Sequence, residues 1–152
     1  MNRQVSAILL VLTALALGAC ATMSATPSAY VANREQPVRG SWSWEAYNAG
    51  TAILNVENVA EDGSFAGDYL FTGSGREYPF QSGPNENGRH ASGQVVTSDG
   101  NVEVKITLFR ADISAEAYYE LRYDPRRDRL TGEFRVPQYG YHWRSVEFRR
   151  TN

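Results

Sequence analysis

The segment Val102-Glu103-Val104-Lys105-Ile106-Thr107-Leu108 alternates apolar and polar side chains at every position. A period of two is typical of a β-strand with one buried face and one solvated face. Residues 115–123 and 130–136 repeat the same alternation. No window of about a dozen residues after the N-terminal apolar run has the 3.6-residue period of an amphipathic helix. The sequence therefore predicts an all-β domain.

Turn-forming residues separate the alternating runs, at Asn48-Ala49-Gly50, Asp62-Gly63, Asp99-Gly100 and Asp124-Pro125. Short hairpin turns join antiparallel neighbours, so successive strands form an up-and-down meander. A meander of this length avoids open edges by closing into a barrel. We expect a single antiparallel barrel of about eight strands, or nine if the short run at 76–81 forms one. The expected strands lie near residues 38–46, 51–60, 64–72, 76–81, 89–98, 101–111, 114–123, 129–136 and 142–150.

Glycines recur inside two of these runs in a shared pattern. Phe65-Ala66-Gly67-Asp68-Tyr69 and Leu130-Thr131-Gly132-Glu133-Phe134 both read apolar, any residue, Gly, acidic, aromatic, each just after a turn. Glycine weakens a strand, so its repeated use there indicates bends or a close approach of backbones, as a tightly coiled barrel needs.

The N-terminal segment has a different character. A short basic start leads into the apolar run Val5–Leu17, which is shorter than the roughly 20 residues of a membrane-spanning helix. The chain's one cysteine follows, in Leu17-Gly18-Ala19-Cys20. This stretch resembles the lipobox of bacterial lipoproteins. The resemblance implies a signal peptide over 1–19, an acylated Cys20 as the mature N-terminus, and a lipid anchor in a membrane.

Residues after the cysteine bear on sorting and tethering. Enterobacterial lipoproteins kept in the inner membrane typically carry Asp immediately after the acylated cysteine, and this chain has Ala21. The resemblance therefore favours the cell envelope, at the periplasmic face of the outer membrane rather than at the inner membrane. Residues 22–37 are rich in Ser, Thr, Ala and Pro without any period, so we expect residues 20–37 to form an acylated, flexible linker to one domain at 38–150.

Gly40-Ser41-Trp42 opens the first expected strand and resembles the Gly-x-Trp signature of lipocalins and their calycin relatives. The segment 62–69, Asp-Gly-Ser-Phe-Ala-Gly-Asp-Tyr, is similar to a hairpin of the avidins. The resemblance implies a lipocalin-like barrel in which the tryptophan closes one end beneath an arginine of the final strands. Arg144, Arg149 and Arg150 are the candidates for that arginine.

Charge and motifs exclude several functions. The chain has 15 Lys and Arg against 17 Asp and Glu, and loss of Arg3 with the signal peptide leaves a charge of −3. This balance argues against a nucleic-acid partner. There is no His-x-x-x-His, no second cysteine and no Gly-x-Ser-x-Gly. We therefore expect no metal, no cofactor and no enzymatic activity.

Aromatic residues remain as binding candidates, and those expected to contact a ligand are Trp44, Tyr69, Tyr139, Tyr141 and Trp143. Rings at a barrel mouth suit a small apolar or amphipathic ligand. Two alternatives stay open. One is a protein-binding module resembling the envelope inhibitors of lysozymes or proteases, whose common disulfide this chain lacks; the other is a structural lipoprotein with a plugged barrel. The discriminating feature is whether Val104, Ile106, Leu121 and Phe134 fill the lumen or leave a cavity.

Overall fold

The structure is a computed structural model that describes residues 36–151. The expected signal peptide, Cys20 and residues 20–35 of the expected linker lie outside the described residues. Within the described range, none of the helical segments has the length and apolar character needed to cross a membrane.

Nine strands and two short 3-10 turns follow one another along the chain, at positions close to those predicted. They are β1 Gly40–Ala46, β2 Gly50–Val59, β3 Phe65–Phe71, β4 Arg76–Pro79, β5 Arg89–Ser98, β6 Asn101–Arg110, η1 Ala111–Ile113, β7 Ala115–Asp124, β8 Arg129–Val136, η2 Pro137–Tyr139 and β9 Tyr141–Thr151. The short run at 76–81 thus provides the ninth strand, β4, over Arg76–Pro79.

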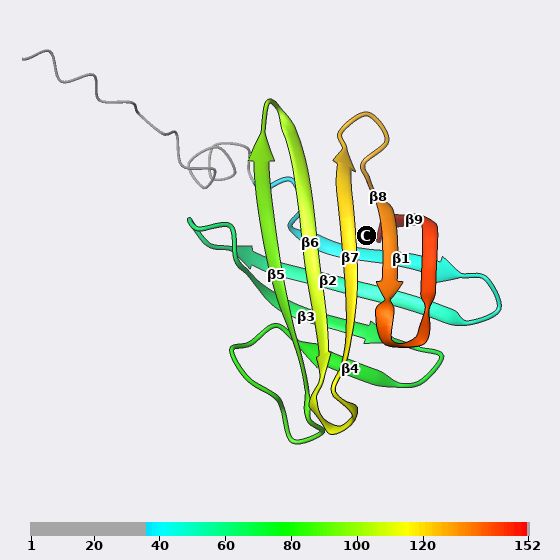
Figure 1. Ribbon diagram of the computed structural model, residues 1–152. Helices are drawn as coiled ribbons and strands as arrows, with labels where there is room; N and C mark the ends of the chain where they lie inside the picture. Colours follow the sequence, from blue (N-terminus) through cyan, green and yellow to red (C-terminus); the bar gives the residue numbers. More distant parts are fainter. Residues whose placement is uncertain (1–35, 152) are drawn as a thin grey trace, which may run out of the picture.

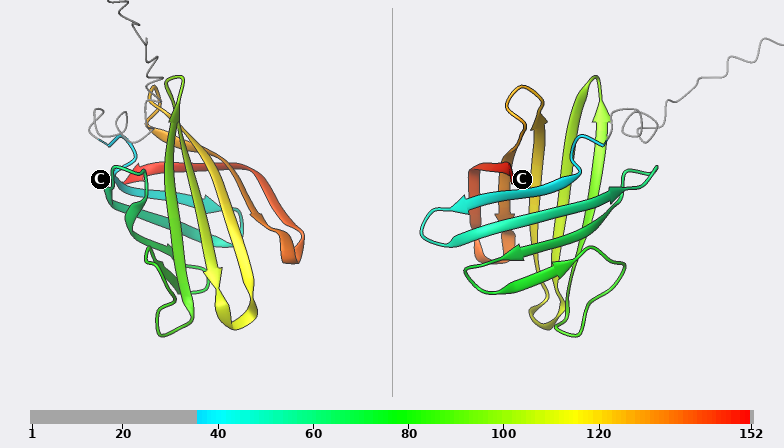
Figure 2. Two further views of the ribbon diagram at one scale, coloured as in Figure 1. Left: turned by 60° about the vertical axis from the view of Figure 1, so that its left-hand side comes forward. Right: turned by 180° about the vertical axis from the view of Figure 1, so that it is seen from behind.

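The strands form one nearly closed barrel in the order β4-β3-β2-β1-β9-β8-β7-β6-β5, so the first and last strands are neighbours. Figure 1 shows β5, β6 and β7 crossing in front of β1 to β4, and Figure 2 shows the same crossing from two further sides. All eight hydrogen-bonded pairs of strands are antiparallel. The prediction of an all-β, antiparallel up-and-down barrel is confirmed.

The one departure from a pure meander lies between β4 and β5. Nine strands cannot alternate direction all the way around a ring, so one neighbouring pair must run parallel. Residues 80–88 carry the chain back along the barrel, and Phe80 and Ala91 form an isolated parallel bridge. The barrel is completed on this side by few backbone contacts, including Val95 N–H to the Gly63 carbonyl at 2.8 Å.

Two strand glycines, Gly67 and Gly132, stand where neighbouring backbones come very close. A Cβ on Gly67 would overlap the carbonyl oxygen of Asn55, and a Cβ on Gly132 would overlap that of Glu120. Each glycine also lies beside a shift of register, between β2 and β3 and between β8 and β9. The predicted close approach at these glycines is therefore confirmed, and it accompanies β-bulges that increase the local twist.

One end of the barrel is closed by Trp42, whose side chain is fully buried. The indole Nε1 donates a hydrogen bond to the Val38 carbonyl at 2.8 Å. The Arg150 guanidinium carbon lies 4.1 Å from the centroid of the Trp42 ring. Of the three candidate arginines, Arg150 takes this place, and the assignments of Arg144 and Arg149 to it are wrong. Strand alternation turns Arg149 outward, while Arg144 lies at the bulge of β9 and is exposed.

Packed aliphatic side chains fill the half of the barrel next to Trp42. Val104, Ile106 and Leu121 are each at most 3% exposed there, together with Leu54 and Leu130, which are fully buried. We call this half the closed end. The opposite, open end holds the β1–β2 and β3–β4 turns, η1 and η2. Gln36 and Pro37, where the described chain begins, lie at the closed end, since Arg150 bonds the Pro37 carbonyl at 2.8 Å.

Candidate functional site

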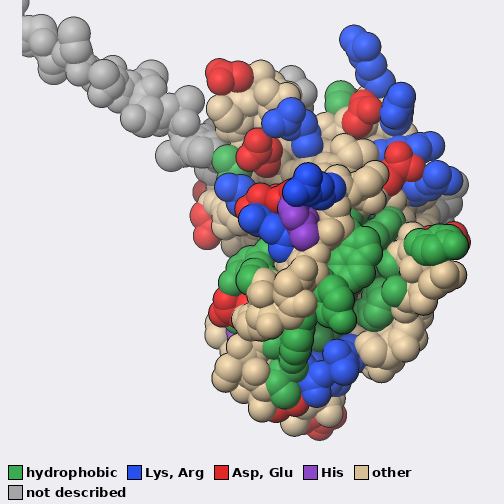
Figure 3. Space-filling view, turned by 45° about the vertical axis from the view of Figure 1, so that its right-hand side comes forward, with side chains coloured by type: hydrophobic (Ala, Val, Ile, Leu, Met, Phe, Trp, Pro, Cys, Tyr) green, Lys and Arg blue, Asp and Glu red, His purple; other side chains and the backbone are tan. Residues whose placement is uncertain are grey.

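The open end of the barrel encloses a cavity of about 490 Å³. This volume lies within the roughly 300–1,000 Å³ that is typical of small-molecule sites. Hydrophobic side chains gather in this hollow in the space-filling view (Figure 3). The barrel is therefore filled at the closed end and hollow at the open end.

Nine aromatic side chains dominate the walls: Trp44, Tyr69, Phe71, Tyr78, Tyr119, Phe134, Tyr139, Tyr141 and Trp143. Five of them form a continuous series from the inner end of the cavity to its rim. The distances between the centroids of successive rings are 4.4 Å for Tyr119 and Phe134, 5.4 Å for Phe134 and Trp143, 5.5 Å for Trp143 and Tyr141, and 6.2 Å for Tyr141 and Tyr139. Small and aliphatic residues, among them the alanines of β7, complete the walls and leave the space between the rings open.

The β-bulge in β9 is what turns Trp143 into this cavity. Gly132 pairs with Val146, whereas Phe134 pairs with Trp143, so one residue of β8 faces two residues of β9. In β9, Val146 and Phe148 point inward as even-numbered positions. Without the extra residue, Trp143 would point outward as an odd-numbered position. The bulge reverses that alternation and adds an indole to the cavity wall.

A pair of tyrosine hydroxyls lies at the inner end of the cavity. The hydroxyl oxygens of Tyr69 and Tyr119 are 2.8 Å apart, and both side chains are buried. Burial raises the pKa of both phenols far above the ordinary value, so both stay protonated at physiological pH. Because only one hydroxyl donates within the pair, the other keeps a proton that can be donated to a ligand atom.

Three charged side chains, Arg76, Arg110 and Glu116, line the cavity. No charged side chain is buried in residues 36–151. In the same residues, no three His, Cys, Asp or Glu side chains are grouped in a way that could hold a metal ion. What the arrangement offers chemically is a large apolar surface with a few hydrogen-bonding groups, which suits non-covalent binding.

All five residues predicted to contact a ligand line this one cavity, although they come from three parts of the chain. Trp44 lies on β1, Tyr69 on β3, and Tyr139, Tyr141 and Trp143 lie on η2 and β9. Prediction from sequence missed other wall residues, notably Phe71 and Tyr78 of the β3–β4 hairpin, and it did not assign Tyr119 to the site. Their alternation predicts which face they occupy but does not indicate which part of that face borders a hollow.

A second hollow, of about 560 Å³, lies on the outer face of β6 to β9 and is wide open to solvent. Several of its charged groups are paired, as Arg122 is with Glu103 at 3.6 Å and Glu147 with Arg149 at 3.1 Å. This open, charged surface encloses a ligand less than the cavity between the strands does. The cavity at the open end is therefore the candidate site.

Comparison of the chain with protein-family models, with curated proteins and with solved structures finds no match. The assignment of a function therefore depends on the residues and geometry of this chain alone.

Proposed function

We propose that this chain is an envelope lipoprotein whose barrel acts as a lipocalin-like, non-catalytic carrier of a small apolar or amphipathic molecule. One observation carries the proposal: half of the lumen is a cavity of about 490 Å³ with predominantly aromatic and aliphatic walls. An apolar ligand gains about 25 cal/mol for each Å² of surface that it removes from water. The aromatic series offers such a surface on rings that lose little freedom on binding.

The distribution of packing favours a carrier over a purely structural barrel. Val104, Ile106 and Leu121 fill the closed end as ordinary core residues. Towards the open end, the same strands of the barrel present small side chains at inward positions, such as Ala117 of β7 and Ala46 of β1. Larger residues there would have filled the lumen, as they do at the other end, and would have gained packing energy.

The closed end supports the resemblance to lipocalins on which the proposal draws. Trp42, from the Gly40-Ser41-Trp42 stretch, is capped by Arg150 of the last strand at 4.1 Å. The barrel differs from the eight-stranded meander that the resemblance implies in two ways: it has nine strands, and β4 and β5 run parallel to each other.

Filling the cavity tests the carrier function. Native mass spectrometry of the full chain, purified from its own envelope, should detect a retained small molecule. Ala117→Trp places an indole in the cavity and should abolish that retained mass. Ser92→Trp is the matched control because Ser92 is exposed on the outer face of β5. A ligand retained equally by both variants would place the site elsewhere.

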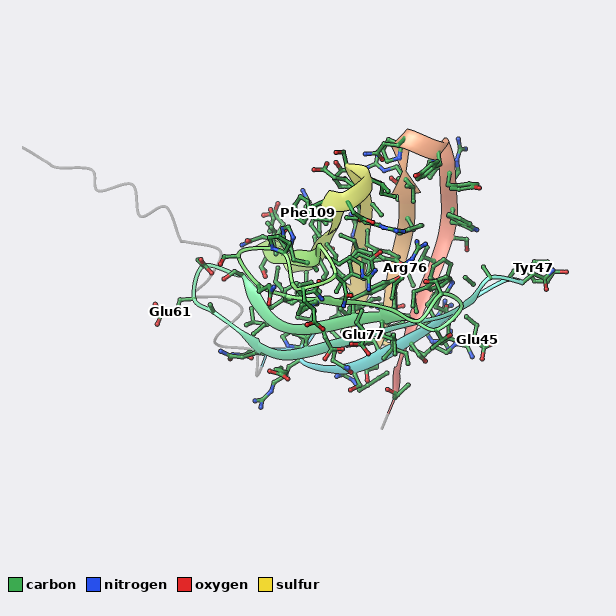
Figure 4. The ribbon with its side chains drawn as sticks, turned by 90° about the horizontal axis from the view of Figure 1, so that it is seen from below. Glu45, Tyr47, Glu61, Arg76, Glu77 and Phe109 are labelled. Carbon is green, nitrogen blue, oxygen red and sulfur yellow. The ribbon has the colours of Figure 1, made fainter. Side chains whose placement is uncertain are left out.

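A second candidate function is docking of an envelope protein at the open end. All four large hydrophobic side chains that are exposed among residues 36–151 lie around it: Tyr47 at 90%, Tyr139 at 57%, Tyr141 at 55% and Ile113 at 45%. Figure 4 shows Tyr47 projecting well beyond the barrel at the tip of the β1–β2 turn. Exposed aromatic residues of this kind are enriched at protein interfaces.

The variants Tyr141→Ala, Trp143→Ala and Tyr47→Ser distinguish the two functions. A carrier should lose its small ligand when Tyr141 and Trp143 are truncated and keep it in Tyr47→Ser. A docking module should lose a co-purified protein in Tyr47→Ser. Binding unchanged in all three variants, with the fold intact, would contradict both functions.

The envelope anchor is tested separately, at the cysteine. Cys20→Ser should leave an uncleaved or soluble precursor, whereas the wild-type chain should fractionate with the outer membrane. A Cys20→Ser chain that matures and partitions to membranes like the wild type would refute the proposed lipid anchor.

A further inference from the structure

Three arginines occupy inward positions at the rim of the cavity, on the consecutive strands β4, β5 and β6. They are Arg76, Arg89 and Arg110, each two residues from a buried inward side chain of its own strand. Arg76 and Arg110 line the cavity directly. Figure 4, seen from below, shows Arg76 among the side chains in the middle of the molecule, whereas Tyr47 and Glu61 project at its opposite sides.

The register of the sheet brings two of these cations together. Arg89 and Arg110 are directly opposite each other in the antiparallel pairing of β5 with β6. Like charges in that position destabilise a sheet. Arg89 also lies over the Tyr78 ring, with 5.9 Å from its guanidinium carbon to the centroid. Tyr78 itself lines the cavity, so the Arg89 guanidinium lies beside the cavity wall.

Among residues 36–151, only one carboxylate contacts any of the three arginines directly. Asp112 of η1 accepts hydrogen bonds from Arg110 Nε at 2.9 Å and Nη2 at 3.0 Å. Arg76 makes no ion pair or side-chain hydrogen bond within residues 36–151. Arg89 donates only to a main-chain carbonyl, that of Glu77, at 3.3 Å. The rim therefore carries two positive charges without a bonded carboxylate, next to an apolar cavity.

Two other acidic side chains nearby, Glu77 and Glu116, make no ion pair with the three arginines in the described part of the chain. Glu77 lies on β4 between Arg76 and the buried Tyr78, and alternation therefore places it on the outer face. Glu116 of β7 borders the cavity, but its carboxylate accepts a hydrogen bond from the Tyr118 hydroxyl, whose side chain lies on the outer face. The three arginines therefore outnumber the two acidic side chains, Asp112 and Glu116, at this part of the rim.

We propose that the ligand is an amphiphile with a single anionic head group, a carboxylate or a phosphate, held between Arg76, Arg89 and Arg110. This inference rests on the proposed carrier function and adds the chemistry of the ligand's head. The apolar tail lies along the aromatic walls, and the head remains at the rim. Guanidinium groups suit this role because two N–H donors of one planar guanidinium can bind two oxygen atoms of the same carboxylate or phosphate. A bound anion also relieves the repulsion between Arg89 and Arg110.

The inner end of the cavity is unsuited to the anionic head. The Tyr69 and Tyr119 hydroxyls there are neutral and already bonded to each other. Among residues 36–151, only tyrosines act on the pKa of these two phenols, so no cation there balances a buried carboxylate, whose desolvation opposes binding. The tail therefore points inward and the head outward.

Ligands with one tail and different heads test the proposal. Dodecanoate, dodecyl phosphate, dodecan-1-ol and dodecylammonium would be titrated below their micellar concentrations into the full chain carrying Cys20→Ser, which removes the proposed acylation site. Fluorescence of Trp44 and Trp143 reports occupancy of the cavity, and calorimetry gives the Kd. We expect an anionic ligand to bind at least tenfold more tightly than the alcohol and dodecylammonium to bind most weakly. The two anions show whether the carboxylate or the phosphate head is preferred.

Charge-removing variants then locate the head. R76Q, R89Q and R110Q should each weaken binding of the preferred anion by about tenfold and change binding of the alcohol by less than about twofold. R144Q is the control because Arg144 is an exposed arginine outside this cavity. Arg76 is exposed, so R76Q should fold normally, and a circular dichroism spectrum of each variant checks this.

The outcomes separate this proposal from the carrier function. Equal affinity for dodecan-1-ol and for the anions, or anion binding that R76Q, R89Q and R110Q leave unchanged, overturns the anionic head site while the carrier function stands. Anion binding lost in Tyr69→Phe but not in R76Q would place the head at the inner end and also overturns it. Failure of all four ligands to bind contradicts the carrier function itself, and with it the head site.

Discussion

Arg150→Ala should destabilise the barrel at its closed end by about 3 kcal/mol. Arg150 donates from Nε to Asp128 at 2.7 Å and from Nη2 to the Pro37 carbonyl at 2.8 Å, and its guanidinium covers the Trp42 ring. These contacts join the last strand to the β7–β8 turn and to the chain before β1. Their loss leaves the edge of the barrel and one face of a buried indole without a partner.

The magnitude follows from the exposure of each contact. The pair of Arg150 and Asp128 has side-chain exposures of 28% and 46%, so screening limits it to about 1 kcal/mol. A hydrogen bond from a charged group to a main-chain carbonyl contributes about 1.5 kcal/mol. The cation–π contact with Trp42 adds about 0.5–1 kcal/mol. Arg150→Lys should lose about half of the total because an ammonium group cannot form the two-pronged contact.

Urea denaturation of the full chain, followed by tryptophan fluorescence and circular dichroism, measures these free energies of unfolding. Arg149→Ala is the matched control, because Arg149 is adjacent, carries the same charge and has a side chain that is 68% exposed. We expect it to change the free energy of unfolding by less than about 0.5 kcal/mol. If Arg150→Ala also cost less than about 1 kcal/mol, the reasoning about closure of this end would be refuted.

Three further predictions concern the same framework. Trp42→Ala should cost about 3–5 kcal/mol in urea denaturation, and a loss below about 1 kcal/mol would show that the indole does not close the barrel. Gly132→Ala should lower the free energy of unfolding by about 1–3 kcal/mol because the added Cβ overlaps a carbonyl oxygen of β7. Gly83→Ala, where a Cβ meets no atom, should leave it nearly unchanged. Equal effects of the two changes would contradict the close approach of backbones at Gly132. The hydrogen bonds from Arg150 lower the pKa of Asp128 in the folded state, so its stabilising contribution is complete above the unfolded pKa near 3.8 and is lost as the pH falls through the folded value. Asp128→Asn should therefore lose less stability than the wild type does as the pH falls below about 4. The same pH dependence of the free energy of unfolding in both chains would contradict the role given to Asp128.

The strands could be predicted closely because their alternation is a local property. In β6, every second residue from Val102 to Leu108 is buried, as the sequence predicts. The turn residues Asp62-Gly63 and Asp99-Gly100 separate strands where expected. The candidate site was predictable in part for the same reason, since aromatic residues near hairpin turns were expected to gather at one end.

The choice of partners across the barrel could not be predicted from local pattern. The sequence offered three arginines for Trp42, and the pairing of β9 with β1 decides among them because it places Arg150 directly opposite Trp42. The bulge in β9 turns Trp143 inward. A bulge inserts one residue without leaving a distinct pattern in composition, so the phase of the alternation after it depends on the pairing with β8.

The sequence by itself determined that the chain forms antiparallel strands, nearly where they begin and end, and which residues face inward within each regular strand, because a period of two and turn chemistry act over a few residues. Only the tertiary structure decided that β4 and β5 run parallel, since an odd number of strands in a ring constrains the whole barrel. Only the tertiary structure decided that the lumen is filled beside Trp42 and hollow beside Tyr119, because free volume depends on side chains from all the strands at one level. It also brought Arg76, Arg89 and Arg110 to one rim from three strands, because the register of the sheet and not the local sequence sets which strand ends lie side by side.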